Sequence, residues 1–226
     1  MSHYGIATQG LVQSVFERGV NHAVVLMRHS AREYAPGKHD LENPLTEEGR
    51  EFARRLGRSL PAELTVRGYA SPPERCMETA ALILEAYAQG GGAVTRHRPV
   101  EGLGVFYALD QMKMWKLMQD GDGQGSFLQR WFRGDVPGDA MIPADLAAQL
   151  VLRLLADKLK APIAQRQLDV CVSHDMTLYL VRDRLLGQGV DHADVEYLDA
   201  VVAYEQDGGL WLQSHHGAAV PVGDRL

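Results

Sequence analysis

A continuous apolar run, AVVLM at residues 23–27, constrains the fold of this chain most strongly. An uninterrupted apolar segment of this length is typical of a buried central strand. Further strand patterns lie at residues 66–70, 94–100 and 168–172, and helix patterns at 46–60, 72–89, 144–160 and 176–186 alternate with them. A hairpin is expected at residues 200–214. This alternation predicts an α/β fold with a mostly parallel sheet.

The chain of 226 residues is short enough to be a single domain, and we interpret residues 1–226 in this way. The stretch at residues 104–142 interrupts the alternating pattern and holds Trp115 and Trp131. We expect this stretch to be an insertion that packs as a lid or cap. Its aromatic side chains are expected mainly to pack against the domain rather than to contact a substrate.

Charge, cysteine content and hydropathy exclude several classes of protein. The formal net charge of −6 is unfavourable for nucleic-acid binding, which needs a basic surface. No apolar run approaches the roughly 18 residues of a membrane span, and no export signal is visible at the start of the sequence. Cys76 and Cys171 form neither a CxxC motif nor a disulfide framework. These features predict a cytoplasmic protein with no nucleic-acid or membrane partner.

Polar, titratable residues follow three of the expected strands. Arg28-His29-Ser30 comes directly after residues 23–27, and Ser173-His174-Asp175 directly after 168–172. A third segment, from Ser71 to Arg75, follows residues 66–70 and has the Ser-x-x-Glu pattern of a helix capping box with proline at the first helical position. Ligand sites in open α/β sheets form at the carboxyl ends of strands, so we expect these segments to meet there.

The charges at this edge of the sheet indicate an anion as the ligand. Arg28, Arg32 and Arg75 would converge there together with His29 and His174. Three guanidinium groups repel one another unless an anion lies between them, and the planar guanidinium binds phosphate oxygens in pairs. The sequence therefore predicts a phosphate site.

Two residues of these segments have the chemistry to act on a bound phosphate. A neutral imidazole at His29, favoured by the surrounding cations, could attack phosphorus through a ring nitrogen. Asp175 is the acid next to the second histidine, and a carboxyl group beside a bound dianion is stabilised in the protonated form that a proton donor needs. Each segment alone is common in proteins without such activity, but the three together predict a catalytic site.

With these motifs the sequence resembles the histidine phosphatase superfamily. The resemblance covers residues 22–190 and consists of Arg28-His29-Ser30, Pro44-Leu45-Thr46-x-x-Gly49, Ser71-x-x-x-Arg75-x-x-x-Thr79 and Ser173-His174-Asp175. It implies a three-layer α/β/α sandwich, a phosphohistidine intermediate on His29 and a phosphate pocket of Arg28, Arg75 and His174. Ser30 stands where the family has glycine.

Two branches of this family differ in their proton donor. The His174-Asp175 pair and Arg32 resemble the acid phosphatase and phytase branch, in which the aspartate donates the proton and the extra arginine binds phosphate. The phosphoglycerate mutase branch instead uses a glutamate after a middle strand, and Glu101 occupies roughly that place. We favour Asp175 and the first branch, although the chain lacks the export signal and large cap usual there.

No metal or cofactor is expected. The segment DGDGQG at 120–125 resembles the start of a calcium loop, but Trp131 stands where the bidentate glutamate belongs. The pair His215-His216 has no evident third ligand. We therefore interpret the first segment as a plain loop and the second as part of an exposed hairpin.

These observations predict a phosphomonoester hydrolase with a phosphohistidine on His29 and Asp175 as proton donor. The alternatives are a mutase or phosphotransferase that uses the same phosphohistidine, and a non-catalytic binder of phosphorylated ligands. The expected substrate is a phosphorylated small molecule, with a phosphoprotein as the alternative, and the apolar hairpin could pair in a homodimer. Basic residues of the insertion are interpreted as solvated surface rather than as a site for a polyanion; they are Lys113, Lys116, Arg130 and Arg133.

Overall fold

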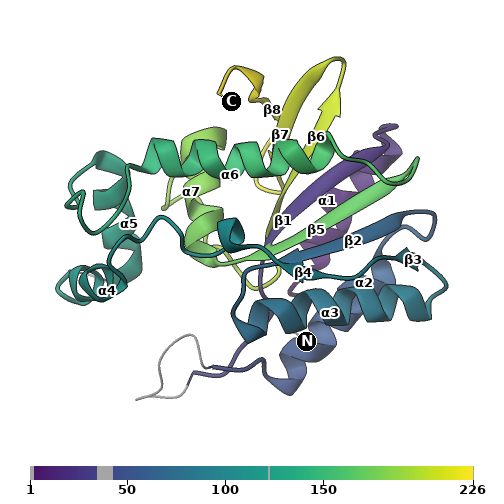
Figure 1. Ribbon diagram of the computed structural model, residues 1–226, viewed down its shortest axis with the longest axis horizontal. Coiled ribbons are helices and arrows are strands. Elements are labelled where there is room, and N and C mark those ends of the chain that lie inside the picture. Colours follow the sequence, from purple (N-terminus) through teal and green to yellow (C-terminus); the bar gives the residue numbers. More distant parts are fainter. Residues whose placement is uncertain (1–2, 35–42, 122, 226) are drawn as a thin grey trace.

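The computed structural model describes residues 3–34, 43–121 and 123–225 and has a central sheet between layers of helices (Figure 1). The strands are β1 (His22–Arg28), β2 (Thr65–Ala70), β3 (Ala93–Val94), β4 (Arg98–Pro99), β5 (Gln167–Ser173), β6 (Ala200–Gln206), β7 (Gly209–Ser214) and β8 (Val220–Pro221). They follow the order β3-β2-β5-β1-β6-β7-β8, and β4 also pairs with β2. Strands β1 to β5 pair in parallel, whereas β6, β7 and β8 pair antiparallel. The predicted mostly parallel α/β/α sandwich is confirmed.

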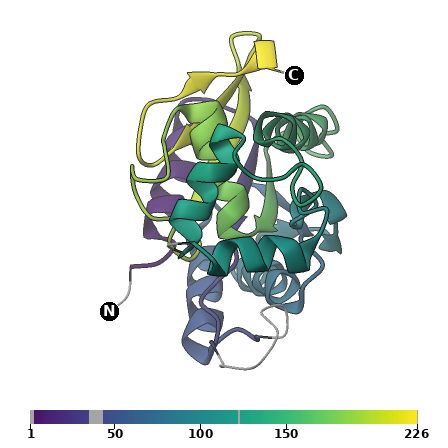
Figure 2. The same cartoon turned by 90° about the vertical axis from the view of Figure 1, so that its left-hand side faces the viewer.

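Helices cover both faces of the sheet and one of its ends. They are α1 (Ile6–Glu17), α2 (Glu47–Ser59), α3 (Glu74–Gln89), α4 (Gln111–Gln119), α5 (Gly123–Arg133), α6 (Ala144–Leu159) and α7 (Asp175–Leu186), with short 3-10 turns η2 (Glu101–Leu103) and η3 (Gly223–Arg225). Figure 2 shows α4 and α5 lying across the end of the molecule that faces the viewer. Among the described residues, no helix combines the length and the apolar character that crossing a membrane requires.

The alternation of side chains along β1 explains the two helical layers. Val24 and Leu26 belong to a core cluster with α5, α6 and α7. Ala23, Val25 and Met27 belong to a second cluster with α1, α2 and α3. Successive side chains of a strand point to opposite faces, so a strand that is apolar throughout needs cover on both sides.

Several predicted boundaries are confirmed and some are wrong. Thr46 caps α2 as expected, because its Oγ1 accepts a hydrogen bond from the amide of Gly49 at 2.9 Å. The capping box at Ser71 does not form: α3 begins at Glu74 after Pro73, with no side-chain cap. A proline disfavours helical backbone angles at the residue before it, so Pro72 and Pro73 keep the chain before them extended. The weak strand at 94–100 is two short strands, β3 and β4, and the helix α1 and the edge strand β8 were not predicted.

The stretch at residues 104–142 packs against the α6 and α7 side of the sheet. Phe127, Trp131 and Phe132 of α5 are buried in that core cluster, as the packing interpretation predicted. Helix α5 begins at Gly123, inside the segment that we interpreted as a loop. That the stretch acts as a lid, and that the chain is one domain, stay predictions.

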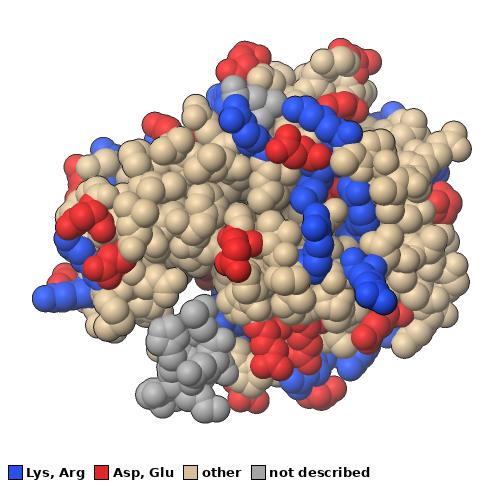
Figure 3. Space-filling model, viewed as in Figure 1, with Lys and Arg blue, Asp and Glu red and all other residues tan. Residues whose placement is uncertain are grey.

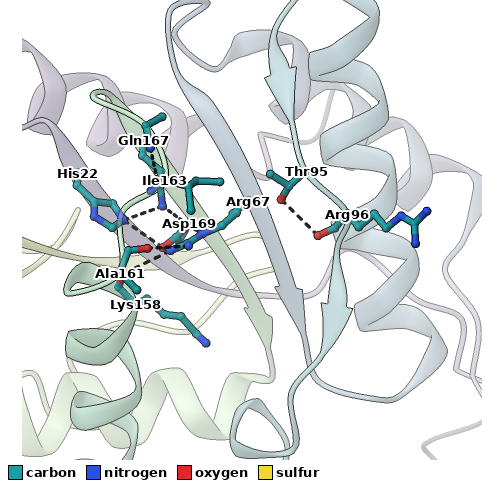
Figure 4. A network of polar contacts seen from close by, with 10 residues as sticks. His22, Arg67, Thr95, Arg96, Lys158, Ala161, Ile163, Gln167 and Asp169 are labelled. Atoms are coloured by element: carbon teal, nitrogen blue, oxygen red, sulfur yellow. Dashed lines mark hydrogen bonds and ion pairs between the residues drawn. The ribbon is translucent and has the colours of Figure 1, made fainter.

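A buried carboxylate ties strands together at the end of the sheet opposite the carboxyl ends of β1 and β5 (Figure 4). The Asp169 side chain, on β5, is inaccessible to solvent and accepts hydrogen bonds from Nε and Nη2 of Arg67 on β2, each at 2.6 Å. Gln167 Nε2 donates to the same carboxylate at 2.9 Å, and His22 Nε2 lies 3.1 Å from it. Burial raises the pKa of Asp169, but the bonds from Arg67 and His22 outweigh it and hold the pKa below its ordinary value.

We expect Asp169→Ala to lower the free energy of unfolding by about 3–5 kcal/mol, because it leaves the Arg67 charge without its partner in a largely buried site. Urea denaturation of the purified variant measures this. The control is Asp157→Ala, an exposed carboxylate near Lys160, whose loss should change stability by about 0.5 kcal/mol or less. Because the pKa of Asp169 is lowered in the folded protein, its carboxylate contributes fully to stability above about pH 4. This contribution is lost as the pH falls further and the carboxylate is protonated. Equal stability of the two variants would contradict this assignment.

Candidate active site

The three predicted segments meet at the carboxyl ends of the strands. Arg28 ends β1, His174 follows β5, and Arg75 lies in the first turn of α3 after β2. They line one cavity of about 170 Å³. The complete lining is Arg28, His29, Arg32, Arg75, Val105, Gln111, Met114, Trp115, Met118, Gln124, His174, Asp175 and Met176. Every residue that we expected in the site is thus brought to one cavity.

His29 is fixed in one tautomer. Its Nδ1 lies 2.8 Å from the carbonyl oxygen of Ser30, which can only accept, so Nδ1 carries the proton. Its Nε2 is then unprotonated, and the electron pair of this nitrogen accepts a hydrogen bond from Nε of Arg75 at 3.1 Å. The side chain is 3% exposed, and burial, followed by the charges of Arg75 and His174, lowers the pKa of His29 well below 6.5. The imidazole is therefore a neutral base at neutral pH.

The loop that carries His29 is packed tightly against α2. The Ser30 hydroxyl donates to the carbonyl of Gly49 at 2.6 Å, and the Ser30 amide donates to Thr79 Oγ1 at 3.1 Å. A Cβ on Gly49 would lie 2.0 Å from the carbonyl oxygen of Ala31, closer than atoms can approach. The Pro-Leu-Thr-x-x-Gly segment thus allows α2 to hold the His29 loop from behind. Ser30 adds a hydrogen bond that glycine could not make.

Ser71, which does not cap α3, orients His174 instead. Ser71 Oγ lies 2.8 Å from His174 Nε2, and the two histidine rings lie edge to face at 5.7 Å between centroids. The preceding hydroxyl, that of Ser173, donates to the carbonyl of Leu103 at 2.6 Å. His174 is 5% exposed, so this network fixes an imidazole in the wall of the cavity.

The two candidate proton donors are placed differently. Asp175 lines the cavity, and its Oδ2 lies 3.2 Å from Nη2 of Arg28. Glu101 is exposed at the start of η2 and is not among the described residues that line the cavity. The geometry therefore favours Asp175 over Glu101.

Arg28 is held by residues that sequence reasoning missed. Its Nη1 donates to the carbonyl of Val195 at 2.7 Å, and its guanidinium lies 4.1 Å from the ring centroid of Tyr197. Both lie in the irregular segment before β6, where no motif marks them. Arg32 lines the cavity, and its Nη1 donates to the carbonyl of Glu33 at 3.1 Å.

Comparison with known proteins places the chain in a family. The family model described as "Histidine phosphatase superfamily (branch 1)" matches residues 24–209. The chain belongs to the histidine phosphatase superfamily. The matching branch corrects our preference for the acid phosphatase and phytase branch. That preference rested on Asp175 and Arg32, two local positions, whereas the family model compares most of the chain.

Solved structures of this superfamily share the fold. A phosphoserine phosphatase mutant from Entamoeba histolytica, in complex with phosphoserine, is 17% identical over 85% of this chain and 95% of its own, with a TM-score of 0.53. A phosphoglycerate mutase from Bacillus anthracis is 19% identical over 88% and 94%, with a TM-score of 0.54. An alpha-ribazole phosphatase from Shigella flexneri is 20% identical over 86% and 96%, also at 0.54. No curated protein sequence matches the chain.

One group outside the cavity has the residue types of a metal site. Asp199, His215 and His216 offer ligand atoms within 4.8 Å of one another. No sequence pattern marks Asp199, which directly precedes β6, whereas the two histidines follow β7. Burial, His215 and the Arg182 guanidinium together lower the pKa of His216 to about 4. A fixed positive charge beside the group opposes a second cation, so we assign no metal to it.

The lowered pKa of His29 has a measurable consequence. The folded protein holds this imidazole neutral below pH 6.5, whereas the unfolded chain protonates it there, so its protonation favours unfolding. Nitrogen NMR of the labelled protein should show the His29 ring neutral at pH 6. Stability should fall as the pH drops below 6.5, and less steeply in His29→Gln. Titration of His29 near pH 6.5 would contradict its burial among cations.

Proposed function

We propose that this protein is a phosphomonoester hydrolase that works through a phosphohistidine on His29. The observation that supports this most strongly is the neutral Nε2 of His29, whose electron pair faces the Arg75 guanidinium inside the cavity. A nucleophile needs a free pair, and a phosphoryl dianion needs nearby cations. Here His29 provides the electron pair, and its hydrogen-bond partner Arg75 provides the positive charge.

Binding of the phosphoryl group would use the cationic end of the cavity. Arg28, Arg32 and Arg75 present guanidinium groups to it, and His174 adds an imidazole. Each hydrogen bond to a charged group contributes about 1.5–3 kcal/mol. The ties of Arg28 to Val195 and of His174 to Ser71 hold these donors in place before the substrate arrives, so little reorganisation is needed.

The reaction then has two steps on the same atoms. Nε2 of His29 attacks phosphorus in line, the ester P–O bond breaks, and protonated Asp175 gives its proton to the leaving oxygen. In the second step a water molecule attacks the phosphohistidine, and the Asp175 carboxylate takes the proton of that water. The P–N bond breaks with its electron pair returning to Nε2, so phosphate leaves and the enzyme is regenerated.

Trapping the intermediate tests the nucleophile. Quenching the enzyme with base after mixing with radiolabelled phenyl phosphate should yield a base-stable, acid-labile phosphoenzyme. His29→Ala should give none, because it removes the attacking nitrogen. The control His3→Ala changes a histidine at an exposed position and should label like the wild type. Labelling of His29→Ala at the wild-type level would exclude the mechanism.

Leaving-group dependence tests the donor. Asp175→Asn should lower kcat for an alkyl phosphate by about 10²–10⁴-fold, because the alkoxide then leaves without a proton. For p-nitrophenyl phosphate, whose leaving group is a weak base, the loss should be much smaller. Glu101→Gln should leave both rates near the wild-type values. The reverse pattern in the two variants would make Glu101 the donor.

Transfer of the phosphoryl group to a second alcohol is the alternative outcome of the same chemistry. The side chains that α4 contributes to the cavity favour it, because a lid at this place would exclude water and let an acceptor compete. Label recovered on an added alcohol rather than in inorganic phosphate would identify a phosphotransferase. Binding of phosphate with no turnover of any ester would identify a non-catalytic binder.

A further inference from the structure

We propose that the cavity contains an apolar subsite for the leaving group, and that the substrates are phosphomonoesters of small, uncharged apolar or aromatic alcohols. The inference rests on the proposed hydrolase function and specifies its substrate class. It comes from the wall of residues that α4 and its neighbours contribute to the cavity lining, which the mechanism does not use.

One face of α4 forms much of this wall. Gln111, Met114, Trp115 and Met118 line the cavity, and their spacing of three, four and seven residues puts them on the same side of the helix. The helix is fixed at its start, because the Asp110 carboxylate accepts a hydrogen bond from the amide of Lys113 at 2.9 Å. Val105 and Met176 complete the apolar lining. A leaving group attached to the bound phosphate would therefore meet mainly thioether, indole and aliphatic carbon, together with the carboxamides of Gln111 and Gln124.

The basic side chains of this stretch do not line the cavity, and Lys116 is exposed. Lys113 pairs with Asp139, and Arg133 with Asp135 at 3.0 Å. Arg130 donates to the carbonyl of Leu117 at 2.7 Å. Figure 3 shows Lys and Arg beside Asp and Glu on the outer surface of this end of the molecule. Among the described residues, the cavity has no lysine and no arginine beyond the three that face the phosphoryl group. Among these lining residues, a leaving group with its own carboxylate or phosphate would find no further positive charge to pair with.

The volume of the cavity suits a small leaving group. The cavity holds about 170 Å³ and opens to solvent, and an apolar protein cavity of ~150 Å³ admits benzene. The phosphoryl group needs part of this volume, and the remainder accommodates one ring or a short alkyl chain. The three methionines of the wall, Met114, Met118 and Met176, are flexible and adapt to different shapes. The subsite should therefore accept several small apolar alcohols rather than one.

The test compares kcat/KM across a matched set of esters. Phenyl phosphate and butyl phosphate should exceed glycerol phosphate and phosphoglycerate by about tenfold or more. Met118→Gln makes the wall more polar. It should lower kcat/KM for the apolar esters and so reduce this preference by about tenfold. Met118→Lys should instead raise kcat/KM for phosphoglycerate, because it supplies the missing charge.

The control variant is Met112→Gln. Met112 is the same residue type on the same helix, but it is 76% exposed and does not line the cavity, so its variant should keep the wild-type preference. A phosphoenzyme on His29 with equal kcat/KM for apolar and charged esters would overturn the subsite and leave the hydrolase intact. Absence of phosphoenzyme with every ester would instead overturn the hydrolase itself.

Discussion

The hydrogen bond from Arg75 Nε to His29 Nε2 is the interaction on which the rest of the site depends. A buried imidazole beside two arginines and a second histidine is costly to protonate, because desolvation and repulsion act in the same direction. Because protonation is unfavourable, the ring stays neutral, and the electron pair of Nε2 accepts the hydrogen bond from Arg75. When a phosphoryl group arrives, the same guanidinium can bind oxygen while the nitrogen faces phosphorus.

Keeping these groups together requires rigid support. The His29 loop is clamped by Gly49 and Thr79, and Arg28 by Val195 and Tyr197. The opposite end of the sheet has its own anchor, where Asp169 and Arg67 bind β5 to β2. When parallel strands are fixed at one end, their carboxyl ends keep constant positions at the other end. Side chains that converge on a site from these carboxyl ends need such fixed positions.

The stretch at residues 104–142 shows how one fold can serve different substrates. Its aromatic residues on α5 belong to the core, whereas α4 presents methionines and Trp115 to the cavity. The sheet and its strand ends provide the phosphate chemistry, and this separate segment provides the surroundings of the leaving group. Membership of the superfamily therefore constrains the reaction more closely than the substrate.

The sequence alone determined the α/β class, most element boundaries and the residues at the strand ends, because apolar periodicity and turn chemistry are local properties. It also predicted that Arg28, His29, Arg32, Arg75, His174 and Asp175 lie together, and they line one cavity, because the carboxyl ends of parallel strands meet at one edge of the sheet. Only the tertiary structure decided that Ser71 orients His174 rather than capping α3, that Glu101 stays outside the cavity, and that Asp199 joins His215. Those outcomes depend on distances between residues remote in the chain, which packing sets and no local pattern encodes.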